Sequence, residues 1–247
     1  KRAPGFNWRA GMTKASYAKR LDFFETPEWP VLAMADIIEK LNPRTICDVG
    51  CGTGAIMRAL MHMNLPRLQD VWGIECDPRR AEIARDHGFR VIQANALKVP
   101  WGKADLNIMT PPFTFSEEFF RKSILEGREQ KATSVVLGRL GFLETQERIP
   151  FHEEHQFDMR VLSHRISFCV VVACLSDACD FRETYSPKED RPSACPWCEG
   201  KVKLTTTDNS AYGWFVHGPG FGGRFDIFKG GPEIMSKYYK EGDVNAK

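Results

Sequence analysis

The 247-residue sequence predicts an α/β fold in which a mostly parallel sheet of about seven strands carries helices on both faces. Short apolar runs alternate four or five times with amphipathic segments, which is typical of parallel strands joined by helices. Hydrophobic residues make up 43% of the chain, enough to bury a sizeable core and to exclude general disorder. No run reaches the ~20 apolar residues of a membrane helix, and the first residues show no secretory segment. We therefore expect a soluble, cytoplasmic protein without membrane contacts.

The first half of the chain supplies most of this alternation. Apolar residues recur at helical spacing over 27–41, after a Thr-Pro start. The helix expected over 78–88 has proline at its start and glycine at its end. A Pro-Pro pair stops the fourth strand, because proline offers no backbone donor. The strands expected in this half are 45–50, 71–77, 89–95 and 104–110, and a helix is expected to run through about Leu65.

The second half begins with the same rhythm and then departs from it. The expected elements are a helix over 116–130, a strand over 132–143, an irregular helical crossover over 144–157, a long strand within 158–174 and a last strand over 211–218. The segment between the last two strands is polar and holds three prolines and several cysteines. It is interpreted as a small cysteine-rich insertion at about 174–205.

A glycine-rich turn, Asp48-Val-Gly50-Cys-Gly52-Thr-Gly54, joins the first strand to the next helix. Glycines are needed where a chain turns sharply or where backbone approaches a ligand closely. The Gly-Lys-Ser/Thr of a phosphate-binding loop is absent, which argues against hydrolysis of nucleoside triphosphates. Glu75 ends the second strand 21 residues after Gly54, where a carboxylate can bind a ribose diol.

This turn, followed by Gly-Ile-Glu-Cys-Asp-Pro, resembles the signature pair of class I S-adenosylmethionine-dependent methyltransferases, over roughly residues 45–143. The resemblance implies a Rossmann-like methyltransferase fold with S-adenosylmethionine as cofactor. In that family the glycine turn lies against the amino-acid part of the cofactor, the acid takes the ribose hydroxyls, and the end of the third strand faces the adenine ring. The implied cofactor-binding residues are Asp48, Gly50, Gly52, Gly54, Glu75 and Asn95. For Asn95, an ordinary strand-ending turn is the alternative.

Thr110-Pro111-Pro112-Phe113 ends the fourth strand, and open α/β sheets bind ligands at the carboxyl ends of their strands. The prolines make a rigid extended turn, so an oxygen and an aromatic face are presented together, which suits a flipped-out base with an exocyclic amine. These residues resemble the (Asp/Asn/Ser)-Pro-Pro-(Tyr/Phe/Trp) motif of amino-group methyltransferases, which implies that all four are catalytic. Thr110 departs from the motif and is chemically closest to serine, so the target base stays open.

Phe24-Glu25-Thr26-Pro27 resembles the segment that closes over the cofactor in phage- and bacterial-type adenine methyltransferases, which adds Thr26 and Pro27 to the implied cofactor-binding residues. Segments 138–148, 161–168 and 211–216 are also similar to phage-type adenine methyltransferases. The resemblance implies methyl transfer to N6 of adenine, with nucleic acid, DNA in particular, as the partner. The alternatives are transfer to the amino group of cytosine, transfer to protein glutamine, and a catalytically silent DNA-binding subunit.

Charge is nearly balanced, with 34 basic and 32 acidic side chains, yet residues 1–20 hold six basic side chains and no acidic one. The chain is therefore divided into a basic N-terminal arm, 1–26, and a methyltransferase domain, 27–247. Such an arm can meet a phosphate backbone, and a solvated tail is the alternative. Because the chain begins at Lys1, further residues can precede it.

Four of the eight cysteines form two pairs, Cys174-x4-Cys179 and Cys195-Pro-Trp-Cys198. Two such pairs can bring four sulfurs to one tetrahedral ion, so a structural zinc knuckle is predicted, with free thiols as the alternative. A catalytic zinc is not expected, because four protein ligands leave no open position. Cys47, Cys51 and Cys76 are expected to pack as small hydrophobic residues.

Overall fold

The computed structural model describes residues 25–168, 170–176, 179, 181–185, 190–206 and 210–239. Most of the basic arm at 1–26 lies outside the described residues, so its contact with phosphate stays a prediction. Within the described part of the chain, no helix is both long and apolar enough to cross a membrane.

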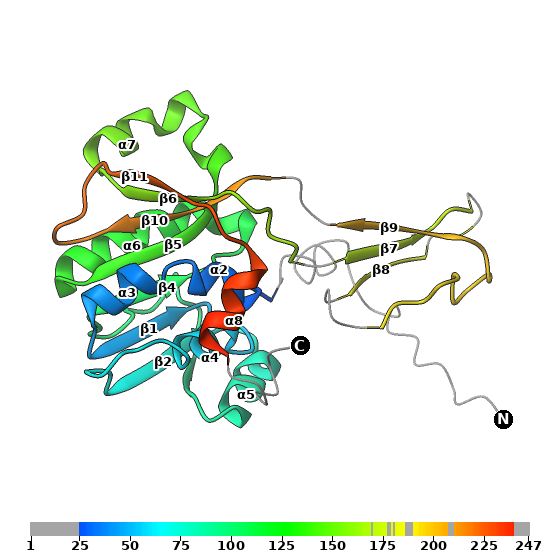
Figure 1. Ribbon diagram of the computed structural model, residues 1–247, viewed down its shortest axis with the longest axis horizontal. Helices are drawn as coiled ribbons and strands as arrows, with labels where there is room; N and C mark the ends of the chain where they lie inside the picture. The colour runs from blue at the N-terminus through cyan, green and yellow to red at the C-terminus, as the bar shows by residue number, and fades with distance from the viewer. Residues whose placement is uncertain are drawn as a thin grey trace.

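An eight-stranded sheet forms the centre of the molecule, in the order β11-β6-β10-β5-β4-β1-β2-β3 (Figure 1). Its strands are β1 (Thr45–Val49), β2 (Asp70–Glu75), β3 (Arg90–Gln93), β4 (Leu106–Met109), β5 (Thr133–Arg139), β6 (Asp158–Leu162), β10 (Tyr212–His217) and β11 (Phe225–Phe228). The pairs among β1 to β5 and the pair β6–β11 are parallel, whereas β10 runs antiparallel between β5 and β6. The predicted mostly parallel, Rossmann-like sheet is confirmed, with eight strands in place of about seven.

Helices cover both faces of this sheet. They are α2 (Glu28–Leu32), α3 (Ala35–Leu41), α4 (Ala55–Leu60), α5 (Pro78–Asp86), α6 (Ser116–Gln130), α7 (Ile149–Glu154) and α8 (Met235–Tyr238), with 3-10 turns at Phe113–Phe115, Leu140–Leu143, Gln146–Arg148 and Pro232–Ile234. One apolar core joins α2, α3 and α4 to strand residues that include Ile46. A second core joins α6 and α7 to Cys47 and Val49. Neighbouring residues of β1 thus enter different cores, because successive side chains of a strand point to opposite faces.

Several predicted boundaries are corrected. The helix expected over 27–41 is two helices, separated by a turn at Ala33 and Met34. At this turn the Ala33 carbonyl oxygen accepts a hydrogen bond from Arg160 Nη1, at 2.8 Å. The helix expected through about Leu65 ends at Leu60, and the strand expected over 132–143 ends at Arg139, after which Leu140–Leu143 forms a 3-10 turn.

The prediction of one long strand within 158–174 is wrong, because this segment contributes to two sheets. β6 ends at Leu162 in the large sheet, whereas β7 (Val170–Cys174) pairs with β8 (Arg182–Tyr185) and β9 (Val202–Thr206) in an antiparallel three-stranded sheet. Between β6 and β7, Ile166 and Phe168 are buried in the core of the large domain. Figure 1 shows the small sheet extending to one side of the large one.

Candidate active site

The two turns predicted to carry the chemistry lie at the same edge of the sheet. From β1 the chain moves outward through β2 to β3, and from β4 it moves outward to β5 on the other side. Strand order therefore reverses between β1 and β4, and doubly wound sheets bind ligands outside the carboxyl ends of strands at such a point. Residues 50–54 follow β1 there, and residues 110–113 follow β4.

The glycine turn bends back onto β2. The amides of Gly50 and Cys51 both donate to the Ile74 carbonyl oxygen, at 2.8 and 3.0 Å. Gly50 has a φ of 78° and Gly54, which precedes the first residue of α4, a φ of 90°, a region that glycine adopts without steric cost. No atom lies within 4 Å of the position of a Cβ on Gly50, so the space beside this backbone is open to a ligand.

The turn is held close to β2 because Gly73 has no side chain. A Cβ on Gly73 would lie 2.4 Å from Cys51 Sγ and 2.7 Å from Cys51 Cβ. The predicted packing of Cys47 and Cys51 is confirmed, since both are buried, whereas the prediction for Cys76 is wrong. Cys76 is exposed because it follows the end of β2.

We expect Gly73→Ala to lower the free energy of unfolding by about 2–3 kcal/mol, because the new methyl group overlaps the Cys51 side chain in a packed core. Gly50→Ala is the matched control, since it bears the cost of a left-handed backbone, about 1 kcal/mol, without any overlap. Urea unfolding measures both values. A loss at Gly73 no larger than the loss at Gly50 contradicts the prediction.

Glu75, the last residue of β2, is held against the glycine turn. It is 4% exposed, and its Oε2 accepts a hydrogen bond from the Gly52 amide at 2.9 Å. Its Oε1 accepts from the Asp77 amide at 2.7 Å, and Arg80 Nε lies 3.9 Å from the same oxygen. Because a carboxylate oxygen has two lone pairs, each can still accept a hydrogen bond from a ligand hydroxyl.

Asp48, in β1, is fully buried, and neither of its carboxylate oxygens has a hydrogen-bond partner among the described residues. Burial raises the pKa of the Asp48 carboxyl well above its usual range, and the Glu75 carboxylate raises it further. A buried carboxylate without a partner is costly, so a ligand that brings a cation or hydrogen-bond donors to this oxygen pair relieves that cost.

Thr110, directly after β4, is bound by Thr26 from the segment before α2. Their Oγ1 atoms are 2.7 Å apart. In the same segment Glu25 accepts hydrogen bonds from the Thr53 hydroxyl at 2.6 Å and from Arg58 at 2.9 Å. Residues 25–27 therefore connect the glycine turn to the Thr-Pro-Pro-Phe turn, although 84 positions separate the two threonines.

One face of the Phe113 ring, expected to be open for a stacked base, is covered by an arginine. The guanidinium carbon of Arg139 lies 4.0 Å from the ring centroid, and Arg139 Nε donates to the Tyr212 hydroxyl at 3.3 Å. Phe168 and Tyr212 also contact Phe113, with ring centroids 5.9 and 6.1 Å away. No motif of the sequence indicates these aromatic contacts. Pairing of β10 with β5 places Tyr212 beside Arg139.

Asn95, which the sequence predicts to contact the adenine ring, makes a structural contact within its own turn. Asn95 is exposed, and its Oδ1 accepts from the Leu97 amide at 3.0 Å, which closes a turn after β3. Its contact with adenine stays a prediction. Phe142 and Trp214 lie in the core, and Arg148 binds Glu117 at 3.1 Å.

The four cysteines of the insertion come together. The sulfur atoms of Cys174, Cys179, Cys195 and Cys198 all lie within 4.8 Å of one another. Cys174 and Cys198 sulfurs are 3.5 Å apart, and those of Cys179 and Cys195 are 3.6 Å apart. A Cβ on Gly200 would lie 3.2 Å from Cys198 Sγ, so this turn favours glycine. The cluster has the ligand number and softness of a tetrahedral zinc site.

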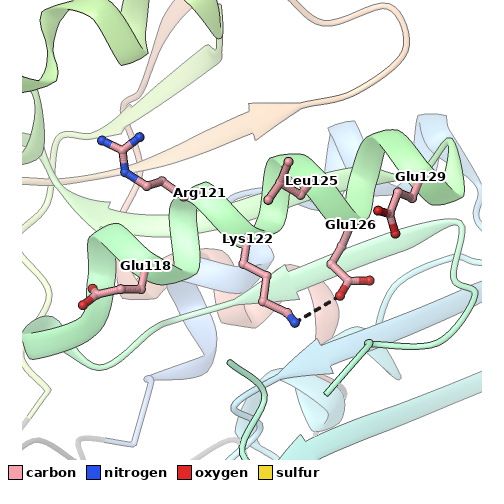
Figure 2. A pocket seen from close by; sticks show the side chains of 6 residues that line it. All are labelled: Glu118, Arg121, Lys122, Leu125, Glu126 and Glu129. Atoms are coloured by element: carbon pink, nitrogen blue, oxygen red, sulfur yellow. Dashed lines mark ion pairs between the residues drawn. The ribbon is translucent and has the colours of Figure 1, made fainter. Parts of the chain in front are cut away.

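A shallow groove elsewhere on the surface is unrelated to these residues. It is lined by α6 side chains: Glu118, Arg121, Lys122, Leu125, Glu126 and Glu129. Figure 2 shows them along one side of the helix, where Lys122 pairs with Glu126 at 3.2 Å. None of the predicted site residues lines it.

The chain is similar to one curated protein over part of its length and to several solved structures in fold. No protein-family model matches it. A curated protein, mycinamicin-resistance protein MyrB of Micromonospora griseorubida, is 29% identical over 108 residues, 42% of this chain. The match spans a third of the length of that relative.

Solved structures with a similar fold include three proteins described as methyltransferases or as a transferase. They are the 23S rRNA methyltransferase ErmE (TM-score 0.48, 13% identity, 86% of this chain and 74% of that one), a dimethyladenosine transferase from Plasmodium falciparum (0.46, 16%, 79% and 63%) and a type I restriction-modification methyltransferase subunit from Streptococcus thermophilus (0.49, 13%, 83% and 47%). Assignment to the DNA adenine type stays a prediction.

Proposed function

We propose that this protein transfers the methyl group of S-adenosylmethionine to an exocyclic amino group of a base in nucleic acid, N6 of adenine in DNA above all. One observation carries the proposal. Two elements with different chemical tasks, the acidic glycine turn and the Thr-Pro-Pro-Phe turn, meet at the switch point of one sheet, joined by the Thr26–Thr110 hydrogen bond.

The glycine turn, together with Asp48 and Glu75, suits the cofactor. Bound S-adenosylmethionine supplies an electrophilic methyl group. The Glu75 carboxylate, held by two backbone amides, offers acceptor positions to the ribose hydroxyls. The unpartnered oxygens of Asp48 suit the ammonium group at the amino-acid end of the cofactor, and the bare backbone at Gly50 leaves space for that end. In this proposal Thr26 and Pro27 would close this side of the site, and Asn95, two residues after β3, would contact the adenine ring.

The Thr-Pro-Pro-Phe turn suits the exocyclic amine of the target base. In this proposal Thr110 and the Pro111 carbonyl oxygen accept the amine hydrogens, which leaves the nitrogen lone pair free for the methyl group. Transfer would break the sulfur–methyl bond, with S-adenosylhomocysteine as the leaving group, and the proton lost from the nitrogen would pass by way of these acceptors to solvent. Pro112 fixes the backbone, and Phe113 stacks the base once Arg139 has moved from its ring face or has joined the stack. The rate gain comes mainly from positioning two reactants in a site that excludes water.

The test uses the full chain, radiolabelled S-adenosylmethionine, and double-stranded DNA, single-stranded DNA and RNA in separate reactions. Digestion and mass analysis identify the modified nucleoside. Label in N6-methyladenine from DNA is the expected result. Label in a cytosine derivative or in RNA moves the assignment to that target. Tight cofactor binding without label in any nucleic acid contradicts the proposal and favours a protein substrate or a silent subunit.

We further propose that Cys174, Cys179, Cys195 and Cys198 hold a structural zinc ion. Zn–S bonds of about 2.3 Å in a tetrahedron separate the sulfurs by roughly 3.8 Å, close to the 3.5 and 3.6 Å found in two of the pairs. With four thiolates the ion has no open position for chemistry, so its role is to fold the insertion.

A further inference from the structure

We infer that Thr26 is a positioning residue for methyl transfer: its hydroxyl accepts the hydrogen bond of Thr110 and thereby leaves the Thr110 oxygen as an acceptor for the substrate amine. The inference rests on the proposed function and deepens it. It explains how a threonine can stand where related motifs carry aspartate, asparagine or serine.

The geometry holds the two hydroxyls together. Thr26 is 5% exposed, Thr110 is partly buried, and their oxygens are 2.7 Å apart, the usual distance for a strong O–H···O bond. Thr26 cannot easily move away, because Glu25 on one side is bound to Thr53 and Arg58. On its other side, Pro27 leads directly into α2, whose residues are packed in the core.

The direction of this hydrogen bond decides whether Thr110 offers the substrate amine an acceptor or a donor. A hydroxyl has one hydrogen and two lone pairs, whereas a carboxylate or amide oxygen is an acceptor alone. An amine about to be methylated needs acceptors for its hydrogens, and a hydroxyl hydrogen aimed at its nitrogen would compete for the lone pair. When Thr110 donates to Thr26, both Thr110 lone pairs stay available as acceptors and the donated bond also polarises the oxygen. The pair then presents the acceptor that aspartate or asparagine presents alone.

The first set of variants isolates the hydroxyl of Thr26. Thr26→Val keeps the shape of the side chain and removes the acceptor, whereas Thr26→Ser keeps the acceptor. With DNA as substrate, we expect Thr26→Val to lower kcat about tenfold or more, with the dissociation constant of S-adenosylmethionine changed less than about threefold. Thr26→Ser, which restores the acceptor, should recover most of the kcat that Thr26→Val loses. Equal losses of cofactor affinity and kcat in Thr26→Val point to a structural role and overturn the inference.

The second set asks whether Thr26 acts through Thr110. An asparagine at position 110 carries its own acceptor oxygen, so Thr26→Val combined with Thr110→Asn should recover kcat at least fivefold over Thr26→Val alone. Thr26→Val should add no further loss to Thr110→Val, because the two residues act as one unit. Independent, multiplicative losses and no recovery with asparagine overturn the inference while the methyltransferase activity stands. A wild-type protein that methylates no nucleic acid overturns the proposed function, and the inference with it.

Discussion

Asp48→Asn is expected to stabilise the cofactor-free protein while weakening its binding of S-adenosylmethionine. The wild-type carboxyl is fully buried without a hydrogen-bond partner among the described residues, and burial together with Glu75 holds its pKa well above the usual range. An amide of the same size carries no ionisation penalty, so the free energy of unfolding near neutral pH should rise by about 2 kcal/mol. Affinity for the cofactor should fall about tenfold or more, because no carboxylate is left to bind the ammonium group of the ligand.

The dependence of the free energy of unfolding on pH tests whether Asp48→Asn stabilises the protein for the stated reason. A carboxyl whose pKa is higher in the folded state than in the unfolded chain binds a proton more tightly when folded. Its penalty on folding is absent below the unfolded pKa, near 4, and grows as the pH rises toward the folded pKa. The stability gain of Asp48→Asn should therefore be small at pH 4 and increase toward pH 8.

Asp77 provides the matched control. Hydrogen bonds from the Arg80 and Arg79 amides at the start of α5 lower the pKa of Asp77, so its ionised form favours folding and its contribution is lost as the pH falls. Asp77→Asn should give no stability gain at any pH. Chemical unfolding from pH 4 to 8 and calorimetric titration with S-adenosylmethionine measure both variants. An Asp48→Asn protein that is destabilised and still binds cofactor normally shows that the carboxylate has a structural partner instead.

The sequence predicted the parts of this site that are local along the chain. The glycine turn directly follows one buried strand, and Glu75 ends the next one. Their positions in the sequence alone therefore place them at one edge of a parallel sheet. The same holds for Thr110, at the end of β4. Apolar periodicity also identified the core strands, since both faces of β1 are buried.

The contacts that tune the site could not be predicted, because they join distant segments. No local pattern relates Thr26 to Thr110, or Arg139 to Phe113. Apolar composition was misleading at 158–174, where Ile166 and Phe168 fill the core between two strands of different sheets. β11 escaped prediction because three of its four residues are exposed, so it lacks the alternation of a half-buried strand.

Removing the metal is expected to unfold the three-stranded sheet while the eight-stranded sheet stays folded. The described part of the insertion has a small apolar core, formed mainly by Val172, Phe181 and Cys195, which is too little to offset the ordering of its chain. Zinc binding to four thiolates supplies roughly 10–16 kcal/mol in small zinc modules, so folding here should follow occupancy. Elemental analysis should give one zinc per chain. Chelation, or Cys195→Ser, should abolish amide exchange protection in β7 and β9, whereas β1 and β4 keep theirs.

The same treatment should lower methyl transfer, although no cysteine of the cluster belongs to the reacting turn. Phe168 lies just before the strands of the three-stranded sheet and Tyr212 follows them, and both rings pack against Phe113. An unfolded insertion loosens these two anchors, so we expect kcat to fall about tenfold or more, whereas Glu75 and Asp48 keep the cofactor affinity near its wild-type value. Cys76→Ser, which removes an exposed thiol outside the cluster, should change neither. If the metal-free protein retains full activity and full protection in β7, the cysteine cluster neither folds the insertion nor supports Phe113, and the four thiols are simply neighbours.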